Sequence, residues 1–462
     1  MLLSIEKLIY GGDGLARTPA GADGRSPDGL SPAGRFLAVF VPFVLPGERV
    51  EAEIRQEKSG FARGSVTQLI EASPERIEAR CPYFRQCGGC HYQHIPYERQ
   101  LEFKAGILRE TLQRIAKIEL TSEIRLHASP PWNYRNRTRL QVRTAPEFAL
   151  GYFRFGSHDF LPVRECPISS VLINRMMARM LELGGLNCPS IVEELELFAD
   201  AADEHLLVWA FCGNDSDKRD LLRWAEALER DVPEISGVTF FSSRFSSRHR
   251  FSPRRSSREG AEEDEMTDLK VLAQSGAKAL RYRTQNHDYQ VSAGGFFQVN
   301  RALIDELVSV VTGNAGGDLA LDLYAGVGLF SVALAGNFHH IFSVEASQTA
   351  YGDLVQNAPV NVKAVGARTE DYLKSGSLKS GPVRGLPDLV VLDPPRTGAG
   401  KAVIRSLVEL GARRIRYVSC DPATLARDLA PLLAAGYRIE EAHLFDLFSE
   451  TFHIESVMLL AR

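Results

Sequence analysis

Cys420 has the surroundings expected of a reactive thiol. It follows a β-like run from Ile415 to Ser419, and the chain turns at Asp421-Pro422 directly after it. A cysteine at the end of a strand, before a tight turn, can present its sulfur in the cleft where α/β folds usually keep catalytic groups. An inert, buried thiol is the commoner fate of a single cysteine. The other motifs of the chain favour the reactive thiol.

A glycine-containing loop from Asp322 to Ser331 follows an apolar strand and opens a helix. Gly326 and Gly328 allow a tight turn and a close approach of the backbone to a ligand. The loop lacks the third glycine of a dinucleotide fingerprint and the Gly-Lys-Ser/Thr of a Walker loop. Glu345 ends the next strand, about where an acid binds ribose hydroxyls in a Rossmann-like fold. The loop and its acid resemble the S-adenosylmethionine site of class I methyltransferases, with an ordinary strand-to-helix turn as the alternative.

Asp393 begins the sequence Asp-Pro-Pro-Arg directly after the apolar run from Leu389 to Leu392. The two prolines stiffen the turn and could aim the carboxylate into a crevice. Methyltransferases that act on exocyclic amines usually carry an aromatic residue after such a pair of prolines. The residue here is Arg396, so the pattern points away from that chemistry. A plain proline-rich loop is the alternative.

Three cysteines lie in one short loop that also contains two adjacent glycines: Cys81, Cys87 and Cys90. The glycines let the backbone wrap a metal centre closely. Cys166 is the best candidate for a fourth ligand, because a Cys-Pro sequence recurs at iron–sulfur ligands. His91 and His94 could instead complete a zinc site. Unrelated thiols are the third interpretation.

Together, these motifs resemble the RNA (uracil-5)-methyltransferase family, specifically its iron–sulfur-containing 23S ribosomal RNA branch. The resemblance covers nearly the whole chain and implies two cofactors, S-adenosylmethionine and a [4Fe-4S] cluster. The implied cluster ligands are Cys81, Cys87, Cys90 and Cys166. The implied S-adenosylmethionine contacts are Gln298, Tyr324, Glu345 and Asp393. Cys420 would be the catalytic nucleophile, and Glu455 would be the general base.

The chemistry of this family explains why one cysteine, one base and one methyl donor are needed. Carbon-5 of uracil is a poor nucleophile until a thiolate adds to carbon-6. A base must then remove the carbon-5 proton so that the thiolate can leave. Glu455 precedes the apolar run from Val457 to Leu460, so partial burial is expected to raise its pKa towards a useful range. A solvent-facing strand residue is the alternative for Glu455.

Other functions remain open at this stage. A transfer RNA enzyme of the same family is one, although the barrel and the cysteine loop make it less favoured. A non-catalytic RNA-binding protein with the same fold is another, and intact Cys420 and Glu455 argue against it. Radical iron–sulfur chemistry would call for a Cys-x3-Cys-x2-Cys spacing, which differs from the spacing here.

The periodicity of the sequence predicts three parts. Residues 1–75 read as short strands of an OB-like β-barrel, which the resemblance identifies as a TRAM domain. Residues 76–285 read as a mixed α+β iron–sulfur and RNA-binding domain, with an Arg/Ser-rich insertion at 244–266 that we expect to be disordered. Residues 286–462 alternate strands with helices, which predicts an α/β domain with a largely parallel sheet. The resemblance implies that this domain is a class I, Rossmann-like methyltransferase. Its predicted strands are Leu319–Tyr324, His340–Glu345, Leu389–Leu392 and Ile415–Ser419.

One helix is expected from Tyr97 to Ile115, directly after the cysteine loop. Its apolar face contains Leu101, Ala105, Leu108, Leu112 and Ile115. This helix could pack on the C-terminal domain, which would make the domain boundaries discontinuous.

The composition fits a soluble globular protein. The chain has 462 residues, of which 44% are hydrophobic and 24% charged, and a formal net charge of -4. RNA binding must therefore use local basic patches, such as the run from Tyr134 to Arg137 with Arg139, for which a solvated strand face is nearly as good an explanation. We expect no secretory signal and no membrane span. Seven cysteines form no disulfide framework, so we expect a cytoplasmic protein, and we expect it to be a monomer.

Overall fold

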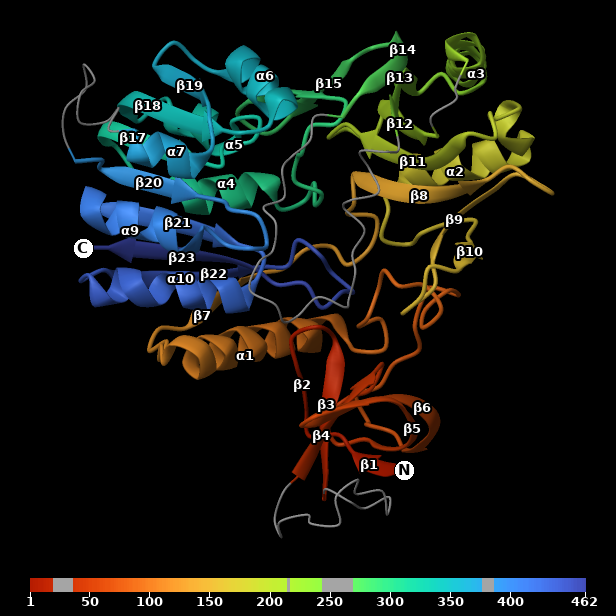
Figure 1. The fold of residues 1–462 in the computed structure, drawn as a ribbon, viewed down its shortest axis with the longest axis horizontal. Coiled ribbons are helices and arrows are strands. Elements are labelled where there is room, and N and C mark those ends of the chain that lie inside the picture. The colour runs from red at the N-terminus through yellow and green to blue at the C-terminus, as the bar shows by residue number, and fades with distance from the viewer. Residues whose placement is uncertain (20–35, 214–216, 243–268, 376–385) are drawn as a thin grey trace.

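The computed structural model describes residues 1–19, 36–213, 217–242, 269–375 and 386–462 (Figure 1). The predicted Arg/Ser-rich insertion at 244–266 lies outside the described residues. Figure 1 shows three regions, each built around its own β-sheet. The N-terminal sheet lies at one end of the molecule, beside helix α1 (Tyr97–Ala116).

The N-terminal region is a six-stranded sheet with the strand order β1-β5-β6-β4-β3-β2. Its strands are β1 (Leu2–Ser4), β2 (Lys7–Leu8), β3 (Asp13–Pro19), β4 (Phe36–Pro42), β5 (Arg49–Lys58) and β6 (Phe61–Glu71). The two edge strands, β1 and β2, are consecutive in the chain, so the sheet curls round on itself. Small apolar side chains such as Val39, Val41 and Ala62 fill its interior and are fully buried. The barrel predicted from the short strands is therefore present.

The central region is a seven-stranded sheet with the order β10-β9-β8-β11-β12-β13-β14. Its elements are β8 (Arg137–Arg143), β9 (Ala149–Phe153), β10 (Phe160–Pro162), α2 (Val171–Glu182), η1 (Gly184–Leu186), β11 (Val192–Ala199), β12 (Leu206–Cys212), α3 (Lys218–Asp231), β13 (Ile235–Ser242) and β14 (Val271–Gly276). Helices α2 and α3 cover one face of this sheet, where Met177, Leu221 and Trp224 pack into the core. A hairpin of β15 (Ala279–Arg283) and β16 (Asp288–Ser292) leads into the C-terminal region.

The C-terminal region is an eight-stranded sheet with the order β19-β18-β17-β20-β21-β23-β22-β7. Strands β17 to β21 run parallel, and β23 is antiparallel to both of its neighbours. Its strands are β7 (Ile124–His127), β17 (Gly317–Leu323), β18 (Phe338–Glu345), β19 (Val362–Gly366), β20 (Leu389–Leu392), β21 (Arg414–Ser419), β22 (Arg438–Phe445) and β23 (Glu455–Ala461). Its remaining helices are α4 (Ile304–Thr312), α5 (Leu329–Leu334), α6 (Gln348–Asn357), α7 (Thr369–Lys374), α9 (Gly400–Leu410) and α10 (Pro422–Ala434). The predicted parallel α/β arrangement is confirmed.

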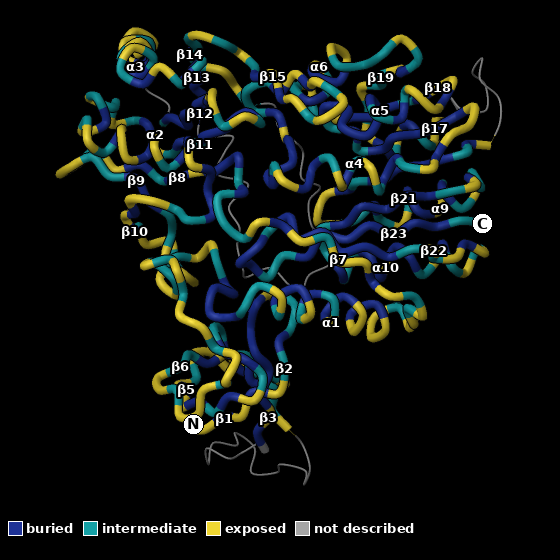
Figure 2. Tube along the Cα trace, turned by 180° about the vertical axis from the view of Figure 1, so that it is seen from behind, coloured by how far each residue is buried: buried dark blue, intermediate teal, exposed yellow. Residues whose placement is uncertain are grey.

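Both faces of this sheet are covered, which explains why its strands read as continuous apolar runs. On β17, Leu319 and Leu321 point into a core shared with α1, α7, α9 and α10. Ala320, between them, points into the opposite core, shared with α4, α5 and the central sheet. The buried strands and the exposed outer turns of the helices are distinguished in Figure 2.

Helix α1 and strand β7 belong to the C-terminal sheet in space, although the chain reaches them before the central region. Strand β7 pairs in parallel with β22, with Ile124 opposite Ala442. Leu108 and Leu112 of α1 are fully buried in the same core as α10. Ile115, expected on the apolar face of this helix, is 43% exposed, whereas Ile107 is buried. The helix therefore docks through a face rotated slightly from the expected one.

Candidate active site

Cys420 directly follows β21 and precedes α10. Asp421 caps the helix, because its Oδ1 accepts hydrogen bonds from the amides of Ala423 and Thr424 at 3.0 and 2.8 Å. The turn that the sequence predicted at Asp421-Pro422 is thus the start of a capped helix. The thiol is partly exposed at the carboxyl edge of the parallel strands. This is the edge at which α/β enzymes bind their ligands.

Glu455 is the first residue of β23, the antiparallel neighbour of β21. The register pairs Ser419 with Ser456, so Cys420 and Glu455 are the next residues along the two strands. The Glu455 side chain is 5% exposed. Burial raises its pKa well above the ordinary value, and the charge of Asp393 raises it further. The structure therefore brings the predicted nucleophile and the predicted base together.

Asp393 follows β20, which lies between β17 and β21 in the sheet. Burial raises the pKa of its carboxyl to about 7. Burial also raises the pKa of the Cys420 thiol to about 12, and the charges of Glu455 and Asp393 add to this shift. Arg396, at the end of the same Asp-Pro-Pro-Arg turn, lowers the thiol pKa. Asp393 thus lies between the glycine loop and the thiol.

The glycine loop after β17 has the geometry that its sequence predicts. Gly326 and Gly328 adopt φ angles of 57° and 93°, in the left-handed region that favours glycine. A Cβ atom at Gly326 would meet no atom within 4 Å, so the backbone there is open to a ligand. Glu345, at the end of β18, accepts hydrogen bonds from the amides of Gly326 and Ser347 at 2.8 and 2.7 Å. These two bonds fix the carboxylate beside the loop.

Two further predicted residues are Tyr324, which follows β17 at this edge of the sheet, and Gln298. Tyr324 opens the glycine loop with a φ of 64°, and burial raises the pKa of its hydroxyl to about 12. Gln298 is 7% exposed, in the segment between β16 and α4. The main-chain oxygen of Gln298 accepts a 3.0 Å hydrogen bond from Asn136 Nδ2, which ties this segment to the central sheet.

The four predicted cluster cysteines gather at one place. Burial raises the pKa of Cys90 well above its ordinary value, and the charges of Cys166, Cys87 and Cys81 raise it further. Cys166 has the same effect on Cys81 and on Cys87, after burial. Asn174 holds the Cys166 backbone with hydrogen bonds of 2.7 and 3.0 Å. Cys166 is therefore near enough to the loop to act electrostatically on its three thiols.

The two histidines of the alternative zinc site pack among aromatic rings. His91 stacks on Phe43 of the barrel and contacts Phe452, and His94 lies against Phe84. Within the described part of the chain, no group of three or more His, Cys, Asp or Glu side chains is arranged to hold a single metal ion.

The basic run that leads into β8 is divided between the interior and the surface. Tyr134 and Asn136 are buried, and Arg137 is 9% exposed between the rings of Phe198 and Trp209, 4.3 and 4.5 Å from its guanidinium carbon. Arg135 is half-buried and Arg139 is exposed, so an RNA-binding face stays a prediction for these two side chains. The alternative of a solvated strand face is wrong for the three buried side chains. They join the central sheet to the C-terminal region instead.

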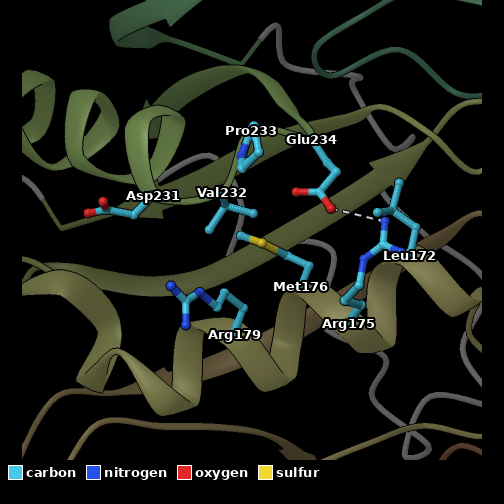
Figure 3. A pocket seen from close by; sticks show the side chains of 8 residues that line it. All are labelled: Leu172, Arg175, Met176, Arg179, Asp231, Val232, Pro233 and Glu234. Atoms are coloured by element: carbon cyan, nitrogen blue, oxygen red, sulfur yellow. Dashed lines mark ion pairs between the residues drawn. The ribbon is translucent and has the colours of Figure 1, made fainter.

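The pocket in Figure 3 lies away from these groups. It lies between α2 and the segment that joins α3 to β13, and Arg175 there pairs with Glu234 at 3.0 Å. None of its lining residues belongs to the C-terminal sheet. In addition, the search of the described residues finds no helix that is long and apolar enough to cross a membrane.

Comparison with known proteins places this site in a family. Residues 268–462 match the model of tRNA (Uracil-5-)-methyltransferase, and residues 1–67 match the TRAM domain. The 23S rRNA (uracil(1939)-C(5))-methyltransferase RlmD of Halomonas elongata is 32% identical over 96% of this chain and 90% of its own. An uncharacterized RNA methyltransferase of Aquifex aeolicus is 31% identical over 99% and 97%. The chain belongs to the RNA (uracil-5)-methyltransferase family.

The methyltransferase is accordingly an S-adenosylmethionine-dependent enzyme that acts on RNA. Its fold is also similar to that of the Pyrococcus abyssi tRNA (uracil-54, C5)-methyltransferase in complex with S-adenosyl-L-homocysteine. The TM-score is 0.68, at 24% identity and with full coverage of both chains. The expected TRAM barrel and methyltransferase fold are confirmed.

Several residues near the site carried no recognised signal in the sequence. Tyr10 of the barrel donates a hydrogen bond to the carbonyl oxygen of Cys420. Lys104 of α1 pairs with Asp446, and both side chains are fully buried. The sequence marks the Gly11-Gly12 turn beside Tyr10, but nothing local shows where this turn docks. Lys104 breaks the apolar face of its helix, which is the one local sign of a buried partner.

Proposed function

We propose that this enzyme methylates carbon-5 of a uridine in 23S ribosomal RNA through a covalent adduct with Cys420. The observation that carries the proposal is the adjacency of Cys420 and Glu455 at the carboxyl edge of the sheet, beside the Asp393 turn. The full-length similarity to RlmD of Halomonas elongata supports ribosomal RNA as the substrate. The arrangement also fits the two-step chemistry of carbon-5.

In this mechanism, the Cys420 thiolate forms a bond from Sγ to carbon-6 of the flipped-out uracil, and the ring becomes an enolate. S-adenosylmethionine supplies an electrophilic methyl group when it is bound. Carbon-5 takes up this methyl group, and Glu455 then removes the carbon-5 proton. The electrons of the broken C–H bond restore the double bond and expel the thiolate. Glu455 is suited to hold a proton because burial raises its pKa.

We assign the S-adenosylmethionine contacts to Gln298, Tyr324, Glu345 and Asp393. Support comes from the open backbone at Gly326 and from Glu345, which two amides hold beside the loop. Each Glu345 oxygen that accepts an amide retains a lone pair for a ribose hydroxyl. Asp393 lies between this loop and Cys420, where it can orient the donor towards the target base.

We further assign a [4Fe-4S] cluster to Cys81, Cys87, Cys90 and Cys166. Four cysteine thiolates are the usual ligands of such a cluster. The thiols are near enough for the charge of one to raise the pKa of another, which supports the proposed set. When bound, the cluster would hold the loop together, and we route no catalytic step through it.

We propose that the chain has three functional parts. They are a barrel (residues 1–75), an iron–sulfur domain (residues 76–285) and a methyltransferase domain (residues 286–462). Helix α1 and strand β7 are the exception, since they lie within the second part in sequence and pack on the third. All seven cysteines are free thiols, which suits the reducing cytoplasm that we propose as the location. We expect the enzyme to act as a monomer.

The proposal is tested by two variants with opposite outcomes. Cys420→Ala should neither methylate RNA nor form an adduct. Glu455→Gln should transfer the methyl group but retain the carbon-5 proton, and should accumulate a protein–RNA adduct that survives denaturing gel electrophoresis. An adduct in Cys420→Ala, or near-normal turnover of Glu455→Gln, would show that other residues fill these roles.

The RNA class is tested separately. Mapping of 5-methyluridine in RNA from a deletion strain should show a loss in 23S ribosomal RNA. A loss confined to transfer RNA would favour the activity named for the Pyrococcus abyssi enzyme and for the family model.

A further inference from the structure

The turn between β2 and β3 carries Tyr10 away from the barrel and towards the active site. Gly11 and Gly12 follow it with φ angles of 106° and 89°, and the Gly12 amide bonds back to the carbonyl of Ile9 at 3.2 Å. A Cβ atom at Gly12 would lie 3.2 Å from the His91 side chain. The turn is therefore pressed against the chain that follows the cysteine loop, and its geometry fixes where Tyr10 points.

The hydroxyl of Tyr10 contacts the backbone of Cys420, the proposed nucleophile. Its Oη donates a 3.3 Å hydrogen bond to the carbonyl oxygen of Cys420, 410 positions later in the chain. Asp421, the residue that caps α10, directly follows Cys420. Burial raises the pKa of Tyr10, and Asp421 raises it further, so the hydroxyl remains a donor throughout the neutral range.

The ring of Tyr10 contacts the β22–β23 connection, which leads into Glu455. The ring meets that of Phe452 edge-on, with centroids 5.8 Å apart. Phe452 lies three positions before Glu455 in the β22–β23 connection, and both rings pack against the core shared by α1 and the C-terminal sheet. One side chain of the barrel thus contacts the segments that carry Cys420 and Glu455.

We propose that Tyr10 is a positioning residue through which the barrel orients the Cys420 thiol for attack on the uracil ring. The inference rests on the proposed function, because it assumes that Cys420 is the nucleophile. The hydrogen bond fixes the peptide group of Cys420, and this group sets the direction of the Cα–Cβ bond that carries the sulfur. The barrel would then contribute to the rate of the addition step as well as to any RNA binding.

The competing role for an exposed tyrosine on an RNA-binding barrel is stacking on a base. The Tyr10 ring is partly buried and packs on Phe452, and its hydroxyl is bonded to the protein. These contacts favour positioning over stacking. The two roles also differ in what they change, since stacking alters RNA affinity whereas positioning alters the rate on bound RNA.

The test uses RNA in which 5-fluorouridine replaces the target uridine, so that no carbon-5 proton can be removed and the adduct accumulates. The rate of adduct formation is measured in single turnover with saturating RNA and S-adenosylmethionine. Tyr10→Phe keeps the ring but loses the hydrogen bond, and should slow the reaction about three- to tenfold, as expected for one lost hydrogen bond. Tyr10→Ala should be slower still, and the RNA dissociation constant of Tyr10→Phe should stay within about twofold of the original.

Tyr437→Phe is the matched control. Its hydroxyl donates a 2.7 Å hydrogen bond to the carbonyl of Ala412, at the edge of the sheet opposite Cys420, so its adduct rate should not change. An unchanged rate in Tyr10→Phe would overturn the inference. So would a weaker RNA affinity with an unchanged rate on saturating RNA, which would make Tyr10 an RNA contact. Absence of an adduct in the original enzyme would overturn the proposed function itself.

Discussion

At the residue scale, the Cys420 thiol lies among groups that oppose its ionisation. Burial raises its pKa to about 12, with Glu455, Asp393 and Asp421 adding to the shift, and Arg396 acts in the opposite direction. At neutral pH the resting thiol is therefore protonated. Thiolate is the attacking species, so the fraction of enzyme able to start the reaction is small and depends on pH.

The expected consequence is a pH-dependent addition step. Below the thiol pKa, the thiolate fraction grows by up to about tenfold per pH unit, so the rate of adduct formation should rise between roughly pH 6 and 8. Asp393, with a pKa of about 7, ionises in this range and raises the thiol pKa, so the rise should be less than tenfold per unit. Arg396→Gln should be slower at each pH, because the guanidinium lowers the thiol pKa. Arg405→Gln, at an exposed position on α9, serves as the control. A rate independent of pH would mean that bound RNA ionises the thiol.

Asp393 gives a second prediction at this scale, on the affinity for the methyl donor. Asp393→Ala should weaken S-adenosylmethionine binding in calorimetry, because the carboxylate lies between the glycine loop and the thiol. Asp388→Ala is the control, since Asp388 precedes the same strand at the opposite edge of the sheet. Unchanged affinity in Asp393→Ala would remove Asp393 from the donor site.

At the element scale, α1 holds the connection that leads into Glu455. Lys104 is fully buried and pairs with Asp446 at 2.5 Å, and its Nζ also donates to the Phe448 carbonyl at 3.1 Å. Gln100 of the same helix donates to the Glu450 carboxylate at 3.1 Å. The connection between β22 and β23 is therefore fixed by a helix more than 300 residues earlier in the chain. The apolar face of α1 docks the helix on the C-terminal sheet, and these polar contacts fix which segment of the connection lies against it.

Loss of the Lys104 charge should destabilise this connection strongly. Lys104→Met leaves the Asp446 carboxylate buried without its partner, which costs about 3–5 kcal/mol in comparable buried pairs. Hydrogen exchange at the amides of β22 and β23 should report the loss. Lys374→Met removes an exposed pair with Glu370, which is worth less than about 1 kcal/mol. Equal exchange in the two variants would contradict the assigned role of Lys104.

At the scale of the whole molecule, the chain that follows the cysteine loop contacts both the barrel and the β22–β23 connection. The amides of His91 and Tyr92 donate to the Glu450 carbonyl at 2.9 and 3.0 Å. His91 also stacks against Phe43 of the barrel. A cluster in this loop would therefore stabilise the contacts among all three regions.

Metal content tests this arrangement. Anaerobically purified protein should be brown and carry about four irons per chain. Because metal binding contributes folding free energy, Cys87→Ser should lower the yield of folded protein more than it alters the chemistry of the fraction that folds. Cys188 is outside the proposed ligand set, so the Cys188→Ser variant should retain the normal iron content. Stoichiometric zinc without iron in such a preparation would reject the cluster.

The sequence by itself determined the features that depend on neighbouring residues. Alternating apolar runs and helices gave the parallel sheet, because each run reflects burial on both faces of one strand. The residues that end these strands, Glu345, Asp393 and Cys420, lie at one edge because parallel strands share their carboxyl ends. The role of Glu455 as the base came from the family resemblance, and its place beside Cys420 comes from the register of β21 and β23.

Only the tertiary structure decided the contacts between distant segments. The docking of β7 on β22 and the bond from Tyr10 to Cys420 each join residues more than 300 positions apart. No local periodicity encodes such pairs. The same limit explains Arg137, whose sequence suggested a surface contact but whose guanidinium is buried between two aromatic rings. Whether a charged side chain faces solvent or a buried partner depends on what packs against it, and for Arg137 the pairing of β8, β11 and β12 in the central sheet settles this.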